Sequence, residues 1–180
     1  MKGQVLISEP FLSDPTFSRS VILITEHESH GTIGYVLNQQ TDFAVNVLIE
    51  GLDMVHQCAY QGGPVELESL HYIHTYPEIS KSTEVLPGVH WSGSFDEVCQ
   101  GLIEGRFLAE NFKFFVGYSG WSPGQLDAEL AEKTWLVSEL TPEVIFDTTI
   151  ADKDLWKHAI RSVGGKDALL ANSPEDPFLN

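Results

Sequence analysis

The sequence predicts a domain in which one mixed β-sheet is surrounded by helices. Apolar runs at residues 21–24 and 112–118 are typical of strands that are buried on both faces. Residues 152–163 instead place Leu155, Trp156, Ala159 and Ile160 on one face of a helix. A chain of 180 residues with both kinds of element fits a single layered core, since one core usually organises about 100 to 200 residues.

The N-terminal part of the chain favours strands. Asp14-Pro15 predicts a turn between the first two, because Asp accepts hydrogen bonds from nearby backbone and Pro fixes its own φ. Gly31 and Gly34 permit a close backbone approach around the third strand. Pro64 limits the fourth strand, because it has no N–H to donate to a sheet. The expected strands cover residues 5–7, 20–25, 32–37, 58–61 and 67–75, with a helix at 43–49.

The C-terminal part favours helices, two of which begin at capping motifs. Ser94 and Glu97 have the spacing of a capping box. The same spacing recurs at Ser122 and Gln125, with Ser122 as the N-cap and Gln125 reaching back to it. Helices are expected at residues 94–104, 123–133 and 152–163, a helical turn from 141, and strands at 112–118 and 135–138. Residues 172–180 are expected to form a flexible tail.

The composition excludes several function classes. Lys and Arg total 10 against 26 Asp and Glu, which gives a formal charge of -16 and opposes direct contact with nucleic acid. No stretch approaches the roughly 18 apolar residues of a membrane span, so no membrane association is expected. Cys58 and Cys99 lack the spacing of a metal site, and we expect both to be reduced and buried in a cytoplasmic protein.

Short motifs, taken together and in order, resemble the YqgE/AlgH family of uncharacterised bacterial proteins over about residues 3–163. The motifs are Asp14-Pro15 with Phe17, Arg19-Ser20-Val21, Glu26-His27, Gly31, Gly34, Asn38, Gly62-Gly63-Pro64-Val65, Gly117-Tyr118-Ser119-Gly120-Trp121, Gly124-Gln125-Leu126 with Glu129-Leu130, and Trp135. The resemblance implies an α+β fold in which a bent mixed β-sheet closes toward a partial barrel with helices packed around it. It implies a single domain over residues 1–171 and no settled activity, although one member's name links it to the regulation of alginate synthesis.

The sequence departs from the family pattern at two places. Gln39-Gln40 follows Asn38 where a basic residue and Pro are expected, and Ser119 stands where the family usually has Ala. Ser119 also lacks the Gly two residues later that a nucleophile elbow requires, because position 121 is Trp. We therefore predict no catalytic residue.

The histidines do not predict a metal site either. His71 and His74 are three residues apart, which places them on opposite faces of a strand. His27 and His30 flank a turn and could approach each other, but neither belongs to a known ligand pattern. No metal and no cofactor are predicted.

The leading hypothesis is a non-enzymatic binding or regulatory domain that acts through a small ligand or a protein partner, as a monomer. Its candidate ligand-binding residues are Arg19, Asn38, Gly62, Gly63, Tyr118 and Trp121. Arg19 has two interpretations, a salt bridge to Glu129 or Glu26, or a fork for a carboxylate or phosphate ligand. A hydrolase or transferase of unknown substrate is the alternative, and a transcriptional regulator is disfavoured by the charge.

Overall fold

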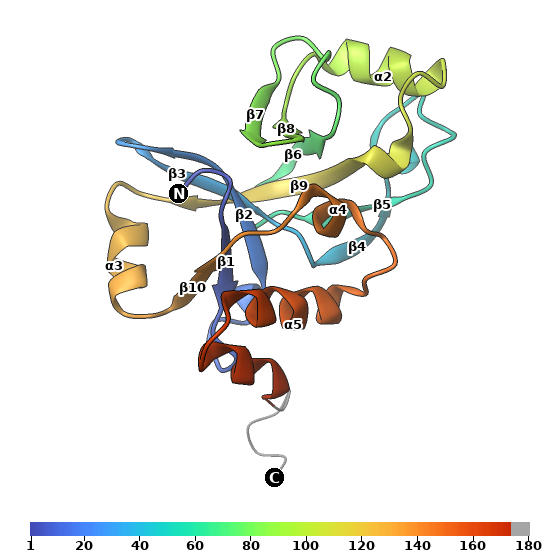
Figure 1. Ribbon diagram of the computed structural model, residues 1–180. Helices are drawn as coiled ribbons and strands as arrows, with labels where there is room; N and C mark the ends of the chain where they lie inside the picture. The colour runs from blue at the N-terminus through green and yellow to red at the C-terminus, as the bar shows by residue number, and fades with distance from the viewer. Residues whose placement is uncertain (174–180) are drawn as a thin grey trace.

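The computed structural model describes residues 1–173, and its centre is an open, bent β-sheet (Figure 1). The strand order is β10-β1-β2-β3-β9-β6-β8-β7, and β5 joins β4 to the side of β9. Neighbouring strands are antiparallel except for β5 and β9, which run parallel. The sheet is mixed, as expected, and it does not close into a barrel.

The strands are short except where they cross the middle of the sheet. Their bounds are β1 (Val5–Ser8), β2 (Val21–Glu28), β3 (Gly31–Val36), β4 (Gln40–Ala44), β5 (Cys58–Gln61), β6 (Val65–His74), β7 (Thr83–Leu86), β8 (Val89–Trp91), β9 (Phe112–Trp121) and β10 (Trp135–Ser138). The long strand β9 pairs with β3, β5 and β6, so it connects the two halves of the sheet.

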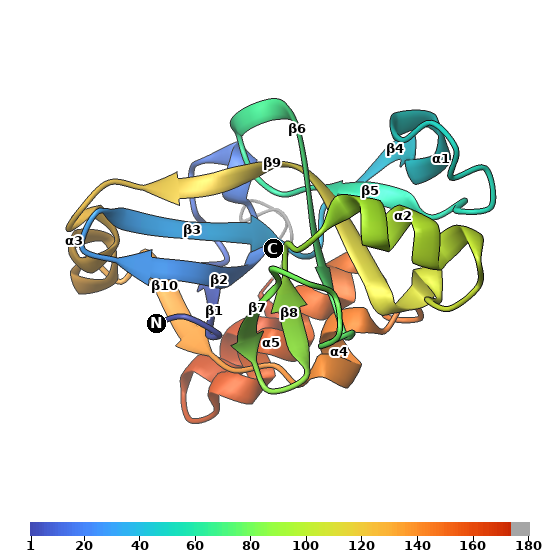
Figure 2. The same ribbon diagram turned by 90° about the horizontal axis from the view of Figure 1, so that it is seen from above.

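Helices cover the sheet from several sides, as Figure 2 shows from above. They are α1 (Val45–Leu48), α2 (Phe95–Ile103), α3 (Gln125–Ala131), α4 (Pro142–Phe146) and α5 (Asp152–Val163), with short 3-10 helices at Pro15–Phe17, Ala109–Asn111 and Asp167–Asn172. Helix α3 lies beside the tip of the β2–β3 hairpin, at the opposite end of the molecule from α2 (Figure 2).

The core divides into three clusters because the central strands are buried on both faces. Val21 and Leu23 of β2 join the cluster that contains Trp156 of α5. Ile22 and Ile24, on the other face of the same strand, join the cluster that contains Leu126 of α3. The third cluster lies under α2, where the members include Tyr72, Val98, Leu102 and Phe114. The Val-Ile-Leu-Ile run therefore serves two cores, as an apolar strand with no polar face should.

Several expected elements match the structure, and others differ for identifiable reasons. The strands at 58–61 and 135–138 and the helix at 152–163 have the expected bounds. The β7–β8 hairpin was not predicted. The helix expected at 43–49 begins only at Val45, because residues 40–44 form β4 against β5. Cys58 and Cys99 are free thiols but only half-buried, so their expected burial was wrong.

The capping box expected at Ser94 was also wrong. The Ser94 side chain makes no capping bond to helix α2. The Glu97 carboxylate instead accepts hydrogen bonds from the backbone N–H (2.9 Å) and the hydroxyl (2.6 Å) of Ser80. A long-range partner has therefore replaced the local one that the spacing suggested.

The end of the described chain packs on the body of the domain. Asn172 closes the last 3-10 helix, and the carbonyl of Ser173 accepts a hydrogen bond from Arg19. The rest of the expected tail, residues 174–180, lies outside the described residues. Within residues 1–173, no helix has the length and apolar character needed to cross a membrane.

Candidate functional site

Two cavities adjoin at the tip of the β2–β3 hairpin, where β9 ends and the chain turns toward α3. Their volumes are about 410 Å³ and about 390 Å³. Both cavities are lined by the same four residues, Gly31, Thr32, Ser122 and Pro123. These residues form a wall with one cavity on either side. Each volume falls in the range of small-molecule sites, which is about 300 to 1,000 Å³. We refer to the pair as the hairpin cleft.

The wall depends on a close contact between two backbones. Gly31 has a φ of 146°, and a Cβ at this position would lie 2.7 Å from the carbonyl oxygen of Trp121. The neighbouring residue, Thr32, pairs with Trp121 in the β3–β9 ladder. A larger residue at position 31 would push the hairpin away from β9 and disrupt the wall between the two cavities.

The turn from β9 into α3 forms the opposite side of the cleft. The Oε1 atom of Gln125 accepts a hydrogen bond of 3.0 Å from the backbone N–H of Ser122, which confirms that Gln125 reaches back across the turn. Gly124, with a φ of 76°, precedes the first residue of the helix. Ser122 is therefore not the N-cap, and that part of the prediction was wrong.

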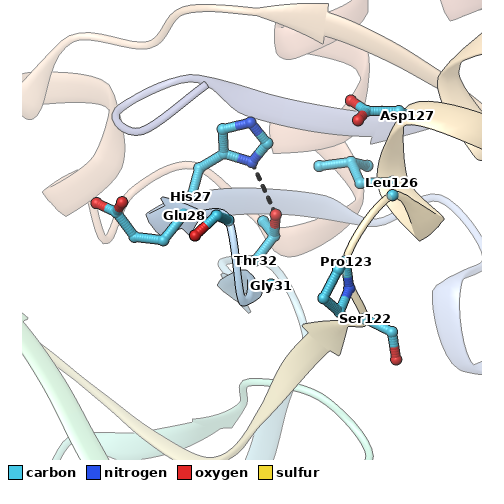
Figure 3. Close-up of a pocket in the computed structure, with 10 residues that line it drawn as sticks. His27, Glu28, Gly31, Thr32, Ser122, Pro123, Leu126 and Asp127 are labelled. Carbon is cyan, nitrogen blue, oxygen red and sulfur yellow. Dashed lines mark hydrogen bonds between the residues drawn. The ribbon is translucent and has the colours of Figure 1, made fainter.

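The first cavity is mainly polar (Figure 3). The Nδ1 atom of His27 lies 2.8 Å from the Thr32 hydroxyl, which fixes the position of the imidazole ring. Glu28 lines the cavity from the hairpin, with its carboxylate turned away from α3 in Figure 3, and Asp127 lines it from α3. Two exposed carboxylates on facing elements favour a ligand with a positive charge.

The second cavity has a more apolar lining, to which Ile33, Val65, Tyr118 and Trp121 contribute. Glu26 also lines it, and its carboxylate lies 3.0 Å from Nε2 of His30. An aromatic and aliphatic surface beside an acid suits a ligand group that is flat and apolar at one end and basic at the other.

Glu129 of α3 holds the aromatic wall in place. Its Oε2 atom accepts hydrogen bonds from the indole N–H groups of Trp121 (2.9 Å) and Trp135 (2.7 Å). Its Oε1 atom accepts a third, of 2.9 Å, from the side-chain amide of Gln125. One carboxylate therefore ties β9, β10 and the start of α3 together, and it satisfies two indole donors that would otherwise be buried without a partner.

The structure brings together only part of the residue set that the sequence suggested. Tyr118 and Trp121 line the second cavity. Gly62 and Gly63 lie behind this surface and serve backbone packing. The Gly62 N–H donates to the carbonyl of Val116 at 3.0 Å, and a Cβ at Gly63 would lie 2.3 Å from the carbonyl carbon of Tyr118.

Arg19 and Asn38 line neither cavity of the cleft. Asn38 accepts a hydrogen bond from the N–H of Val21 (2.8 Å) and donates to the carbonyls of Arg19 (2.9 Å) and Asp152 (3.2 Å). Arg19 donates to the carbonyl of Ser173 at 3.0 Å, and its guanidinium lies 4.5 Å from the ring centre of Trp156. Both residues therefore join the start of β2 to the C-terminal helices.

Ser119 has the surroundings of a structural residue. Its side chain is buried, and its hydroxyl donates to the carbonyl of Gly62 at 3.0 Å. The two strand histidines point to opposite faces, as predicted: His71 contacts Tyr35 and His74 contacts Phe112. Among residues 1–173, no three His, Cys, Asp or Glu side chains gather as a metal site would require.

Sequence reasoning missed the residues that join the two cavities. Gly31 and the Ser122-Pro123-Gly124 turn were each noted, but only as a close approach and as a helix start. Because the pairing of Thr32 with Trp121 is long-range, no local pattern predicts that these two turns face each other. Asp127 carried no signal beyond its position in the first turn of a helix.

Comparison with known proteins agrees with the motif resemblance. Residues 5–168 match the model of a family described as AlgH-like. A UPF0301 protein from Chlorobium chlorochromatii is 39% identical over 179 residues, which cover 99% of this chain and 94% of that protein. A UPF0301 protein from Bacteroides thetaiotaomicron is 36% identical over 180 residues, with coverage of 99% and 91%.

Solved structures show the same fold. The AlgH protein from Pseudomonas aeruginosa superposes with a TM-score of 0.73 at 27% identity, covering 96% of this chain and 94% of that one. A protein from Corynebacterium diphtheriae gives a TM-score of 0.79 at 24% identity, with coverage of 95% and 91%, which is a likeness of fold. Since the family model spans most of the sequence and relatives exceed a third identity, the chain belongs to the AlgH-like family.

Proposed function

We propose that this chain is a non-enzymatic binding or regulatory domain whose ligand occupies the hairpin cleft. The observation that carries the proposal is the pair of adjoining cavities, one polar and acidic, the other apolar and aromatic, separated by the wall at Gly31 and Pro123. Sites of this kind combine an apolar surface with a few placed polar groups. A ligand that spans the wall gains contacts on both sides.

The lining indicates the chemistry of the ligand. Glu26, Glu28 and Asp127 provide negative charge, and the whole chain carries a formal charge of -16. Tyr118 and Trp121 provide a surface for a flat or aliphatic group. The ligand we propose has an amine or guanidinium beside an apolar group, either as a small molecule or as a short basic segment of a protein partner.

The remaining sequence candidates have supporting roles in this proposal. Gly62 and Gly63 keep β5 and β6 close to the back of Tyr118, and Ser119 belongs to the same packing. Arg19 and Asn38 hold the start of β2 against α5, away from the cleft. We propose that ligand contact falls to Tyr118 and Trp121 among the six.

We also infer a single domain over residues 1–171 that works as a monomer in the cytoplasm and without direct contact to nucleic acid. The two free thiols are typical of a reducing compartment. The formal charge of -16 opposes phosphate.

Isothermal titration with two probes tests the proposal, tyramine as a small aromatic amine and a short Arg-Trp peptide as a model of a protein segment. Glu28→Gln and Asp127→Asn are each expected to weaken binding by about two- to fivefold, because exposed charges contribute up to about 1 kcal/mol. Glu50→Gln, which removes an exposed carboxylate outside the cleft lining, is the control and should leave the affinity unchanged. Equal effects of all three variants would show that only net charge matters and would refute a cleft site.

A further inference from the structure

Lys113 of β9 carries its amine into the interior. The residue is 8% exposed, and its Nζ atom donates to the carbonyl of Leu37 at 3.0 Å. The same Nζ lies 4.0 Å from the ring centre of Tyr60 on β5. No carboxylate among residues 1–173 lies within ion-pair distance of this amine. A buried lysine with this environment is uncommon, since lysine is almost never fully buried unless it is paired.

Burial increases the fraction of the Lys113 amine that is neutral near pH 7. It lowers the pKa of Lys113 to about 8, and the more distant carboxylate of Asp152 opposes this shift only in part. The Oδ2 atom of Asp152 is itself engaged, because it accepts a hydrogen bond of 2.8 Å from the N–H of Gln40. About a tenth of an amine with such a pKa is neutral at pH 7 and has a lone pair that can attack an electrophile.

Lys113 also lines a small cavity of about 30 Å³, together with Tyr60, the residue whose ring lies under its amine. A water molecule needs roughly 10 to 15 Å³, so the space admits a group of about two to three non-hydrogen atoms. Its other lining residues are Gln40, Gln57, Cys58, Phe112, Phe114, Phe146 and Thr148. This cavity shares no residue with the hairpin cleft.

We propose that Lys113 is a covalent attachment site for a small aldehyde, which enters this cavity and forms a reversible imine with Nζ. The cavity sets the size of the aldehyde, and the buried amine, which has no carboxylate partner among residues 1–173, supplies the nucleophile. The polar lining groups, among them the hydroxyls of Tyr60 and Thr148, supply hydrogen-bonding partners for the carbonyl oxygen.

The reaction balances without an oxidant or a reductant. The Nζ lone pair forms a bond to the carbonyl carbon, and the carbonyl oxygen receives the two amine protons and leaves as water. A C=N double bond remains. A neutral imine carries no charge, so it suits the buried position better than an ammonium group does. The phenol of Tyr60 stays neutral throughout, because burial raises its pKa to about 12.

Reductive trapping tests the proposal on the full-length protein. The protein is treated with acetaldehyde and sodium cyanoborohydride at pH 7, and each lysine is quantified by peptide mass spectrometry. Lys113 is expected to be ethylated at least about tenfold faster than exposed Lys81 and Lys153, because each pKa unit changes the neutral fraction tenfold. The preference should narrow at pH 9.5, disappear in urea, and reverse with benzaldehyde, which exceeds the cavity.

Two variants of Cys58 separate the cavity from the amine alone. Cys58→Leu fills the space and is expected to slow the labelling of Lys113 at least about tenfold, while the nearly isosteric Cys58→Ser should leave it unchanged. Circular dichroism and thermal melting confirm that both variants fold. Labelling of the exposed lysines with Lys113 unmodified, a preference that persists in urea, or equal labelling of both variants would each overturn the proposal.

Discussion

At the scale of single residues, the structure separates side chains that look alike in sequence. Ser119 lies in a sequence that resembles a catalytic turn, yet its hydroxyl donates a hydrogen bond to the carbonyl of Gly62. Glu129 was suggested as a partner of Arg19, and its carboxylate accepts hydrogen bonds from two tryptophans. The chemical role of each residue follows from long-range partners, which neighbouring sequence does not contain.

Removing the Glu129 carboxylate should destabilise the fold. Glu129→Ala leaves the indole N–H groups of Trp121 and Trp135 without their acceptor, and each buried unsatisfied donor costs about 1 to 3 kcal/mol. We expect the free energy of unfolding in urea to fall by about 2 to 5 kcal/mol. Glu132→Ala, an exposed acid beyond the same helix, is the control, and a similar small loss in both variants would contradict the bridging role.

Replacing Lys113 with an apolar side chain should have the opposite effect. The folded protein holds this amine at a pKa of about 8, below its unfolded value, so the amine costs stability at pH 7 and this cost disappears as the pH rises above about 10.5. We expect Lys113→Met to raise the free energy of unfolding by about 2 kcal/mol at pH 7, after the lost bond to Leu37 is subtracted. A gain that does not shrink between pH 8 and pH 10 would show that the burial of charge is not the cause.

His74, at the end of β6, is expected to cause a loss of stability in mild acid. His74 donates from Nε2 to the carbonyl of Ser92 and accepts at Nδ1 from the N–H of Tyr76, an arrangement that requires the neutral ring. Its pKa is lowered, first by burial and then by the stacked His90, while bonds to Ser92 and Tyr76 and the charge of Glu78 oppose the shift.

A lowered histidine pKa has a definite sign. The unfolded chain takes up a proton near pH 6.5 and the folded one only below it, so the stability is full above about pH 6.5 and falls as the pH decreases. Urea unfolding between pH 7.5 and 5 should show this decline, with a parallel contribution from His71, whose pKa burial also lowers. His74→Gln is expected to flatten the curve and His158→Gln to leave it unchanged; an unaltered slope in His74→Gln would count against the assignment.

At the scale of elements, the turn between β9 and α3 shows how far local patterns can be used. The spacing of Ser122 and Gln125 indicated a capping box, and half of it exists: Gln125 reaches back, while Gly124 takes the position before the helix. The strands and helices with strong apolar periodicity were predictable, because the spacing of apolar residues within one element shows which of its faces is buried.

Mutation of Gln125 and mutation of Ser122 should affect stability differently. Gln125→Ala loses the bonds to Ser122 and Glu129 and should cost about 1 to 2 kcal/mol, because each hydrogen bond contributes about 0.5 to 1.5 kcal/mol. Ser122→Ala, at an exposed residue whose side chain makes no capping bond, should change stability by less than about 0.5 kcal/mol. Urea denaturation of both variants decides between this account and a serine cap, which would reverse the order.

At the scale of the whole molecule, motif order identified the family and the bent mixed sheet, but not the hairpin cleft. Tyr118 and Trp121 were candidates because they belong to the family motif at residues 117–121, and both line the second cavity. The proximity of Gly31, Thr32 and Asp127 was not predictable, because it depends on the pairing of β3 with β9 and on where α3 packs. Arg19 and Asn38 were grouped with Tyr118 and Trp121 although they lie at the other end of β2. The sequence alone does not show how far apart residues on different strands of a sheet lie.

Chemical-shift mapping tests the binding proposal most directly. Uniformly 15N-labelled protein is titrated with tyramine and with the Arg-Trp peptide. The account predicts shifts concentrated at residues 26–33 and 118–127, from both cavities of the hairpin cleft, with a smaller response in Asp127→Asn. Shifts confined to other parts of the chain, or none at a probe concentration of about 10 mM, where even binding weaker than a Kd of 1 mM is visible, would contradict it.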